Sequence, residues 1–444
     1  MDMRSSRGFV FILAFLIGLA QIGLNHPKLV FDTETAYAII AKLSSPIFEG
    51  RICGGKGNES AMAYIAGKFT ESRLSALPGA SSLRQTFESY QPVLRSTPIL
   101  QVLDSKHKVV KSYVHRVDFR EITSGASASG DVTGRFTTAA GVHEVQPGKN
   151  CMILLTNESY TVEDDYALQA YGVKALIIQN PVASVHRKSL SLFGRPMDSR
   201  ASFVKIFVTP DTMRELIADA HQGCLIRVKV DLTINRVRTA NLVGIIKGAS
   251  GADRGLLVLS AHLDHIGRDP SGCIFPGALD NASGVAVMLT LLKAMAVSGT
   301  RPRKTIVFAA LNAEESMLGG SDFLARNWPF DRSNAVEVVN LDMLGAKEVA
   351  ILSCLIAPEA DGRTAVTRLA DKLATIARSM GLPFKRRIYA SADHTSFTTA
   401  GIPAVTLIHD TDVHNVSDNI NHISKARLAE AGNLAAEYLA ENAY

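Results

Sequence analysis

The sequence predicts an α/β protein with a second, mainly-β domain inserted into it. From residue 241 onward, short apolar runs typical of buried strands alternate with helix patterns. Between about residues 98 and 236, strand-like runs alternate instead with Gly- and Ser-rich turns. The length of 444 residues also exceeds the roughly 150 residues of an average domain. We therefore expect a central sheet with helices on both faces, and a smaller inserted domain.

Composition and charge are those of an ordinary globular protein. Apolar residues make up 47% of the chain and charged residues 20%, and the net charge is +5. Dense basic clusters occur at 186–188 and 385–387, and clusters this short are typical of a solvated surface. We therefore expect no nucleic-acid binding.

The N-terminus has the pattern of a signal peptide over residues 1–20. Arg4 and Arg7 precede an apolar run from Gly8 to Ala20, whose last three residues offer a small-x-small cleavage site. The run is short for a membrane-spanning helix. The pattern predicts export to the periplasm or the extracellular space, and an uncleaved membrane anchor is the alternative.

The five cysteines show no C-x-x-C spacing that would indicate a metal or redox motif. In an exported protein they could form one or two disulfides, and the odd count leaves at least one thiol outside such pairs. We interpret them as buried, inert thiols rather than as nucleophiles or ligands.

The first part of the main domain, residues 30–97, and the inserted domain, residues 98–236, contain several recognisable elements. In the first part, we expect a helix over Thr33–Leu43, a second helix with Ala61, Tyr64, Ile65 and Phe69 on its apolar face, and a strand beginning near Arg84. In the inserted part, strands are expected at Ile99–Leu103, Met152–Leu155, Ala175–Ile178 and Ile226–Val230, with a helix over Asp164–Tyr171.

The second part of the main domain, residues 237–444, alternates strands and helices. The strands are expected at Leu242–Ile246, Leu256–Leu259, Thr305–Ala309, Val336–Leu341 and Ala404–Leu407. The helices are expected at Val285–Ala296, Ser321–Arg326, Thr364–Met380 and Lys425–Glu441.

Residues 256–284 combine a buried strand with polar side chains that can bind metal. The apolar run that begins at Leu256 leads to His262 and Asp264, and a Gly- and Pro-containing loop then leads to Asp280. The carboxyl end of a strand is where an open α/β sheet places its ligands. Asp280 precedes a helix pattern, where the helix dipole and free N–H groups favour a carboxylate.

Three further strands are followed by side chains of the same kind. Thr305–Ala309 leads to Glu314 and Glu315, Val336–Leu341 leads directly to Asp342, and Ala404–Leu407 leads through a loop to His414. Acidic groups near a core are costly unless they are paired or bound to metal. The repetition therefore predicts that these side chains meet.

The combination of imidazole and carboxylate without thiolate suits a catalytic zinc site. Two Zn²⁺ carry four positive charges, which Asp280, Glu315, Asp342 and a bridging hydroxide would balance. Such a site lowers the pKa of water and polarises a carbonyl. Glu314 is then available as general base, and Asp264 can accept the other ring N–H of His262.

Each of these residues also has an ordinary structural explanation when it is considered alone. Asp280 could cap a helix, Glu314 and Glu315 could lie in a solvated loop, and His414 could be a surface histidine. Four further histidines are interpreted as ordinary core or surface residues, with His394 the one most expected to line the site. They are His265, His394, His409 and His422.

These motifs resemble the secreted di-zinc aminopeptidases, whose superfamily includes glutamate carboxypeptidase, glutaminyl cyclases and the transferrin receptor. The matching pieces follow the family's order and are SAHLDH (260–265), PGALDNASG (276–284), FAALNAEESMLGG (308–320), NLDMLG (340–345) and HNVSD (414–418). Residues 49–69 resemble the family's N-terminal segment, and YGVKALII (171–178) resembles a protease-associated domain. The resemblance implies a zinc-exopeptidase fold with a mixed central sheet and a protease-associated insert.

Carried over by position, the resemblance implies a role for each residue. Asp280 would bridge two Zn²⁺, His262 and Asp342 would complete one site, Glu315 and His414 would complete the other, and Glu314 would be the base. His394 and Asp418 are expected to support the site or line it. Some members carry a Tyr before the last His that helps to hold the oxyanion, and because Val413 stands there the source of this stabilisation stays open.

The function that this resemblance implies is hydrolysis of the N-terminal residue from peptides with a free α-amine. A dipeptidase or carboxypeptidase, and a one-zinc glutaminyl cyclase, are alternatives on the same fold. An enzyme that recognises the free carboxylate of its substrate needs Arg or Lys at the pocket, and no run in the sequence identifies such a residue. A metal-free, receptor-like protein is a further alternative, but that branch of the superfamily lacks ligands that are all present here.

Overall fold

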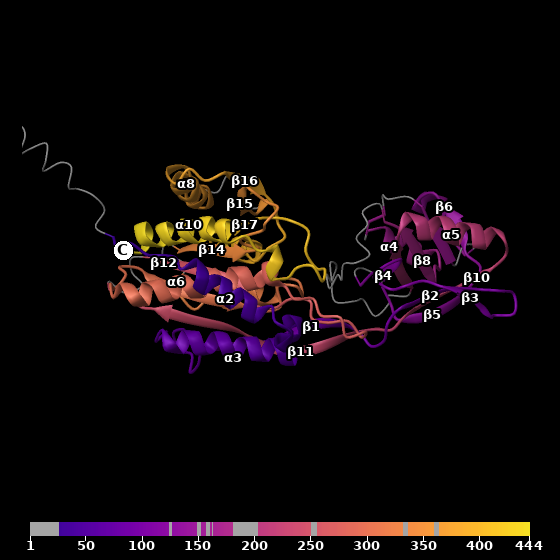
Figure 1. The fold of residues 1–444 in the computed structure, drawn as a ribbon, viewed down its shortest axis with the longest axis horizontal. Helices are drawn as coiled ribbons and strands as arrows, with labels where there is room; N and C mark the ends of the chain where they lie inside the picture. Colours follow the sequence, from indigo (N-terminus) through magenta and orange to yellow (C-terminus); the bar gives the residue numbers. More distant parts are fainter. Residues whose placement is uncertain are drawn as a thin grey trace, which may run out of the picture.

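The computed structural model describes residues 26–123, 127–148, 152–156, 160–161, 163–180, 203–249, 255–331, 336–358 and 364–444. The predicted signal peptide, the basic cluster at 186–188 and Cys151 lie outside the described residues. Figure 1 shows two parts: a main part around one large sheet, and the segment that follows β1 (Arg84–Leu94) and precedes β11 (Leu232–Ile246). These two long strands pair antiparallel and connect the two parts.

The large sheet belongs to the main part and has eight strands in the order β1-β11-β13-β12-β14-β17-β15-β16. Its further strands are β12 (Leu256–His262), β13 (Thr305–Leu311), β14 (Val336–Asp342), β15 (Leu352–Ile356), β16 (Phe384–Ile388) and β17 (Ala404–Ile408). The four central strands β13, β12, β14 and β17 run parallel, whereas β11 and β15 pair antiparallel with their neighbours β13 and β17. The sheet is therefore mixed, and the carboxyl ends of its central strands meet at one edge.

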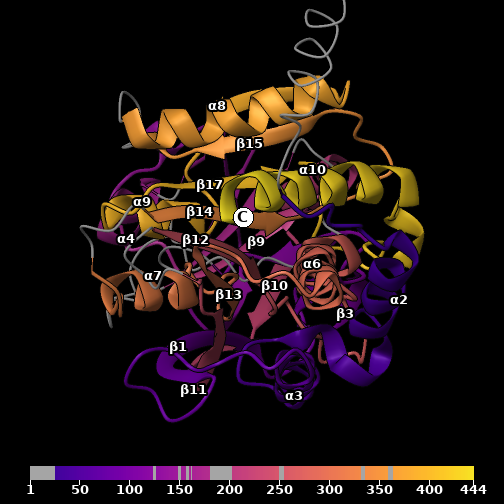
Figure 2. The ribbon, with the colours of Figure 1, turned by 90° about the vertical axis from the view of Figure 1, so that its left-hand side faces the viewer.

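Helices cover both faces of this sheet, as Figure 2 shows. One face packs against α2 (Thr33–Leu43), α3 (Lys56–Glu71), α6 (Gly284–Ser298), α8 (Thr364–Ser379) and α10 (Lys425–Ala443). The other face packs against α7 (Gly319–Arg326) and α9 (His394–Thr399). All side chains of β12 and β13 are buried, which explains why these strands appear in the sequence as continuous apolar runs.

Helix α6 is the most apolar helix of the main part. Together with the preceding turn it forms the stretch Ala278–Ser298, which by length and composition alone could cross a membrane. However, 72% of its most apolar window is buried inside the protein. It is therefore a core helix that packs between the sheet and α2.

The inserted segment contains two smaller sheets. An antiparallel sheet has the order β3-β2-β10-β5, and a mostly parallel sheet has the order β4-β9-β8-β7-β6. The strands are β2 (Ile99–Leu103), β3 (Val109–Ser112), β4 (Phe119–Glu121), β5 (Gly130–Gly134), β6 (Thr137–Ala139), β7 (Met152–Leu155), β8 (Ala175–Gln179), β9 (Val204–Val208) and β10 (Leu225–Val230), and the helices are α4 (Asp164–Ala170) and α5 (Pro210–His221). The segment has its own apolar clusters.

The predicted fold class is confirmed, since a mixed sheet with helices on both faces is present. The predicted strands and helices all occur. Most ends shift by a few residues, as where β12 continues to His262, whereas β11 begins at Leu232, ten residues before the predicted start at Leu242. The strand β11 crosses the proposed domain boundary at residue 236, because its residues 232–242 pair continuously with β1. The identity of the insert as a protease-associated domain stays a prediction.

The cysteines within the described residues are not disulfide-bonded. Cys53 and Cys354 are buried, Cys224 is half-buried, and Cys273 is exposed. Burial raises the pKa of the Cys53 thiol and raises that of Cys354 to about 12. The burial of these two thiols agrees with the expectation, whereas Cys273 differs from it by its exposure.

Candidate metal centre

The parallel strands bring the predicted ligands to one edge of the sheet. His262 is the last residue of β12, and its register partner on β13 is Leu311, three residues before Glu314. Asp342 is the last residue of β14 and pairs in register with Ile408 of β17. The carboxyl ends of parallel strands form the usual ligand-binding edge of an α/β sheet.

Asp280 lies between two groups of candidate ligands. Its Oδ1 is 3.2 Å from Nε2 of His262, which lies 3.3 Å from Oδ1 of Asp342. Its Oδ2 is 3.0 Å from Nε2 of His414, which lies 3.1 Å from Oε2 of Glu315. The five predicted ligands therefore converge, and Asp280 presents one oxygen to each group.

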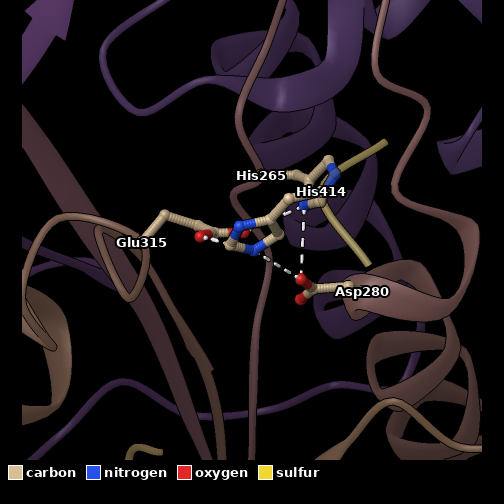
Figure 3. Close-up of side chains that lie close together, drawn as sticks. All are labelled: His265, Asp280, Glu315 and His414. Atoms are coloured by element: carbon tan, nitrogen blue, oxygen red, sulfur yellow. Dashed lines mark hydrogen bonds and ion pairs between the residues drawn. The ribbon is translucent and has the colours of Figure 1, made fainter. Parts of the chain in front are cut away.

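The donor atoms fit a pair of zinc ions. Neighbouring donors are 3.0–3.3 Å apart, a separation expected for ligands that share one ion at bond lengths of about 2.0–2.2 Å. Each group offers one imidazole nitrogen and oxygens from two carboxylates, which is a donor set that zinc accepts. His265 is also within reach of the second group, since its ligand atom and those of Asp280, Glu315 and His414 lie within 4.8 Å of one another, and Figure 3 shows its ring beside these side chains.

Two buried residues outside the ligand set hold the turn that carries Asp280. The carboxylate of Asp418 accepts the backbone N–H of Leu279 at 2.7 Å and that of Asp280 at 3.1 Å. The guanidinium of Arg51, which is fully buried, donates to the carbonyls of Pro276 and Gly277 at 2.8 and 2.7 Å. The structure thus places Asp418, a predicted supporting residue, against the backbone of the Asp280 turn. Arg51 was not predicted from the sequence.

The same turn is tied to the end of β14. Asn281 donates its amide N–H to the carbonyl of Leu341, and its amide oxygen accepts the N–H of Met343. The hydroxyl of Ser283 accepts the N–H of Leu344. These bonds fix Asp280 relative to Asp342 and explain the use of small polar residues in this motif.

Asp264 makes contacts that differ from those predicted. The ring Nδ1 of His262 faces the backbone carbonyl of Asp264 at 3.3 Å, whereas the nearer carboxylate oxygen lies 3.8 Å away. The carboxylate instead accepts the backbone N–H groups of Glu314 and Glu315, at 3.1 and 3.3 Å. Asp264 therefore orients the pair of glutamates as well as His262.

A cavity of about 420 Å³ opens onto both ligand groups, a size typical of small-ligand sites. Its polar wall includes Glu314, the predicted base, and the five predicted ligands. The apolar and small lining residues are Met317, Leu318, Met343, Tyr389, Ala390, Ile408 and Val413. Among the described residues that line the cavity, none is Arg or Lys.

The electrostatics of the site favour bound cations. Burial alone would lower the pKa of His262 and of His414, but the neighbouring carboxylates outweigh burial and raise both pKa values well above the usual range. Burial raises the pKa of Glu314 well above its ordinary value, and that of Asp264 to about 7. For two other carboxylates the neighbouring histidines outweigh burial: the hydrogen bonds from His262 and His414 lower the pKa of Asp280 well below its ordinary value, and the charge of His414 lowers that of Glu315 to about 2. The carboxylates are thus compensated by positive charge on the histidines, a role that bound divalent cations could take over.

The remaining histidines have separate positions. His394 is buried in α9, where its Nε2 faces the carbonyl of Tyr389 at 2.9 Å and its Nδ1 faces the hydroxyl of Thr406 at 2.8 Å. It does not line the cavity but contacts the backbone of Tyr389, which does. Nδ1 of His409 accepts the N–H of Gly345, and His422 lies near Glu348.

Three residues at this site had no role predicted from the sequence: Arg51, His265 and Tyr389. The only signals for the first two were the Glu-Gly-Arg segment that ends at Arg51 and the position of His265 three residues after His262. Tyr389 lies on a segment that had no motif assigned to it. Tyr389 lines the cavity and carries a phenol O–H that can donate a hydrogen bond, which Val413 at the predicted tyrosine position cannot do.

Comparisons with known sequences support the predicted family. The sequence model of peptidase family M28 matches residues 241–439. Aminopeptidase YwaD of Bacillus subtilis is 28% identical over 93% of this chain and 86% of that protein. A probable zinc metalloprotease of Pyricularia oryzae is 38% identical over 112 residues, but this match spans 25% of this chain and 22% of that protein.

Comparisons with solved structures support the fold. An aminopeptidase from Aneurinibacillus sp. strain AM-1 superposes with a TM-score of 0.69 at 22% identity, over 92% of this chain and 94% of that one. The zinc aminopeptidase BSAP of Bacillus subtilis superposes with a TM-score of 0.68 at 22% identity, over 94% of this chain and 96% of that one. The predicted resemblance is confirmed, and residues 241–439, which hold all five candidate ligands, match the sequence model of peptidase family M28.

Proposed function

We propose that the protein is an exported zinc-dependent aminopeptidase that removes N-terminal residues from peptides. The observation that carries the proposal is the convergence of two ligand groups on Asp280 beside a cavity that also contains Glu314. The names of the relatives, which include aminopeptidases and zinc metalloproteases, point the same way. The exported location rests on the signal pattern of residues 1–20.

The proposed centre holds two Zn²⁺ per chain. His262 and Asp342 would hold one ion, Glu315 and His414 the other, and Asp280 would contact both. When bound, such a metal pair lowers the pKa of water and polarises the scissile carbonyl.

The residues of the chain perform the proton transfers. The Glu314 carboxylate accepts a proton from the attacking water and returns it to the leaving amine. Asp264 fixes the backbone of Glu314 by accepting its N–H, so that the base keeps its position in the cavity. We propose that the phenol O–H of Tyr389 donates a hydrogen bond to the developing oxyanion. It would replace the tyrosine that some family members carry at the position of Val413.

The charge of the cavity favours a free α-amine over a free carboxylate as the recognised group. Five lining residues are carboxylates: Asp280, Glu314, Glu315, Asp342 and Asp410. Arg387, a cation beside this wall, is paired with Asp410. An aminopeptidase is therefore favoured over the dipeptidase and carboxypeptidase alternatives, and the apolar wall suits an apolar N-terminal side chain.

A substrate panel tests the proposal. Aminoacyl amides with a free amine, their N-acetylated counterparts, N-acylated peptides with a free C-terminus and peptides with N-terminal Gln are compared with and without a chelator. We expect turnover of the free-amine substrates alone, lost on chelation and restored by Zn²⁺. Release of C-terminal residues would indicate a carboxypeptidase, cyclisation of N-terminal Gln a glutaminyl cyclase, and turnover that survives chelation would refute the metal mechanism.

A further inference from the structure

His265 is a buried histidine beside the metal centre that the five-residue ligand set does not use. It lies on the loop between β12 and the turn of Asp280, and its side chain has no exposed surface. Its Nδ1 is 2.9 Å from Oε1 of Glu315 and 3.7 Å from Oδ2 of Asp280 (Figure 3). The shorter of these distances is that of a hydrogen bond.

The two carboxylate oxygens of Glu315 have different partners. Oε2 is 3.1 Å from Nε2 of His414, on the side where Oδ2 of Asp280 also meets that nitrogen at 3.0 Å. Oε1 meets Nδ1 of His265. Oε2 of Glu315 therefore converges with Oδ2 of Asp280 and Nε2 of His414, whereas Oε1 of Glu315 contacts His265.

The ring of His265 is held in place by close packing. Gly277 has a φ of +62°, and a Cβ atom at this position would lie 2.5 Å from Cδ2 of the His265 ring. The backbone N–H of His265 donates to the carbonyl of Arg51 at 3.3 Å. A glycine at 277 is thus required both by its backbone conformation and by the space that the imidazole occupies.

We propose that His265 is a positioning residue for the metal ligand Glu315. Its Nδ1–H donates to Oε1, which fixes the carboxylate plane and leaves Oε2 directed at the side shared by His414 and Asp280. The inference rests on the proposed metal centre. The two proposed metal sites then differ in how their carboxylate ligand is supported. Glu315 has His265 behind it, and Asp342 has no comparable histidine within the described residues.

Two substitutions separate the hydrogen bond from the bulk of the side chain. His265→Asn keeps an N–H donor near the position of Nδ1, whereas His265→Leu keeps much of the volume without a donor. The matched controls are His143→Asn and His143→Leu, since the His143 side chain is 78% exposed in the inserted segment. Metal-free protein is titrated with Co²⁺ alone, which is followed by visible absorption and by calorimetry.

We expect the unsubstituted protein to bind two Co²⁺ and His265→Leu to bind one of them about 10–100-fold more weakly, the usual cost of losing a hydrogen bond to a ligand. The second ion should be unaffected, and His265→Asn should match the unsubstituted protein in both affinities and in its saturated spectrum. Thermal melting of the metal-free variants should be unchanged.

Several outcomes would overturn the inference. Unaltered affinities in His265→Leu would show that the hydrogen bond does not support Glu315. A changed saturated spectrum in both variants would instead make His265 a direct ligand, and an equal loss of both ions with a lower melting temperature would make it a packing residue. Failure of the unsubstituted protein to take up two ions would refute the proposed function, and this inference with it.

Discussion

Arg116 of the inserted segment forms a two-point ion pair with Asp269, in the loop that connects His265 with Asp280. Nε of Arg116 is 3.0 Å from Oδ2 of Asp269, and Nη2 is 3.2 Å from Oδ1. The same guanidinium bonds to Glu121 at 2.7 Å. The Asp269 and Glu121 side chains are each 1% exposed, so the loop that carries the proposed bridging ligand is tied to the insert by buried charges.

The first prediction concerns this contact between the two parts of the chain. In a double-mutant cycle of Arg116→Met and Asp269→Asn, we expect a coupling free energy of about 0.5–3 kcal/mol in unfolding, as for residues in one buried network. The variants should also lower kcat/KM, because the loop leads to Asp280. The exposed pair Arg214–Asp211 is the control and should show a coupling of about 0.5 kcal/mol or less. Equal coupling in both cycles would contradict the prediction.

The second prediction concerns stability in acid. Burial raises the pKa of Glu121, but the charge of Arg116 and the hydrogen bond from His115 outweigh it and lower the pKa from 4.5 to about 2. Since the folded pKa is below the unfolded one, the contribution is present above about pH 4.5 and is lost as the pH falls toward 2. It amounts to about 3 kcal/mol, by the usual conversion of pKa shifts.

Denaturant unfolding between pH 2 and 7 measures this contribution, with the pH range taken from the two pKa values. Glu121→Gln should be less stable than the unsubstituted protein near neutral pH, and the difference should shrink in acid. Glu88→Gln is the control, because its side chain is 56% exposed. A difference between Glu121→Gln and the unsubstituted protein that does not vary with pH would show that Glu121 does not titrate as proposed.

The third prediction concerns the proposed base. Glu314→Gln should lower kcat about 10²–10⁴-fold, because the amide cannot accept the proton of the attacking water. Metal content should be unchanged, since Glu314 is outside both ligand groups. The neighbouring variant Glu315→Gln is the matched comparison and should lose metal affinity. Equal turnover in Glu314→Gln and the unsubstituted enzyme would remove Glu314 from the mechanism.

The fourth prediction concerns Tyr389. Removal of its phenol by Tyr389→Phe should lower kcat about 10²–10³-fold with little change in KM, as for other donors to a developing oxyanion. Tyr166→Phe, on a side chain that is 81% exposed, should have no effect. If Tyr389→Phe raised KM and left kcat intact, Tyr389 would contact bound substrate rather than the oxyanion.

Much of the candidate site could be predicted because its residues follow strands that are unmistakable in sequence. His262, Asp342 and Glu315 each stand at the end of, or a few residues after, a largely apolar strand, so the sequence predicts that all three reach the same edge of the sheet. The role of Asp264 was harder to predict, because its sequence distance from His262 suggested a side-chain contact. In the structure, the backbone carbonyl makes that contact and the carboxylate turns to the glutamates.

The sequence by itself determined the fold class, the ligand types and the chain order in which they reach the sheet edge, because these depend on local periodicity and on short motifs. The tertiary structure alone decided the contacts between distant segments that have no pattern of their own: Arg51 beneath the turn of Asp280, His265 against Glu315, and Arg116 against Asp269. The physical reason is that burial of a charge or a ring depends on which segments pack around it. Contacts between distant segments produce no periodic pattern in the sequence from which they could be predicted.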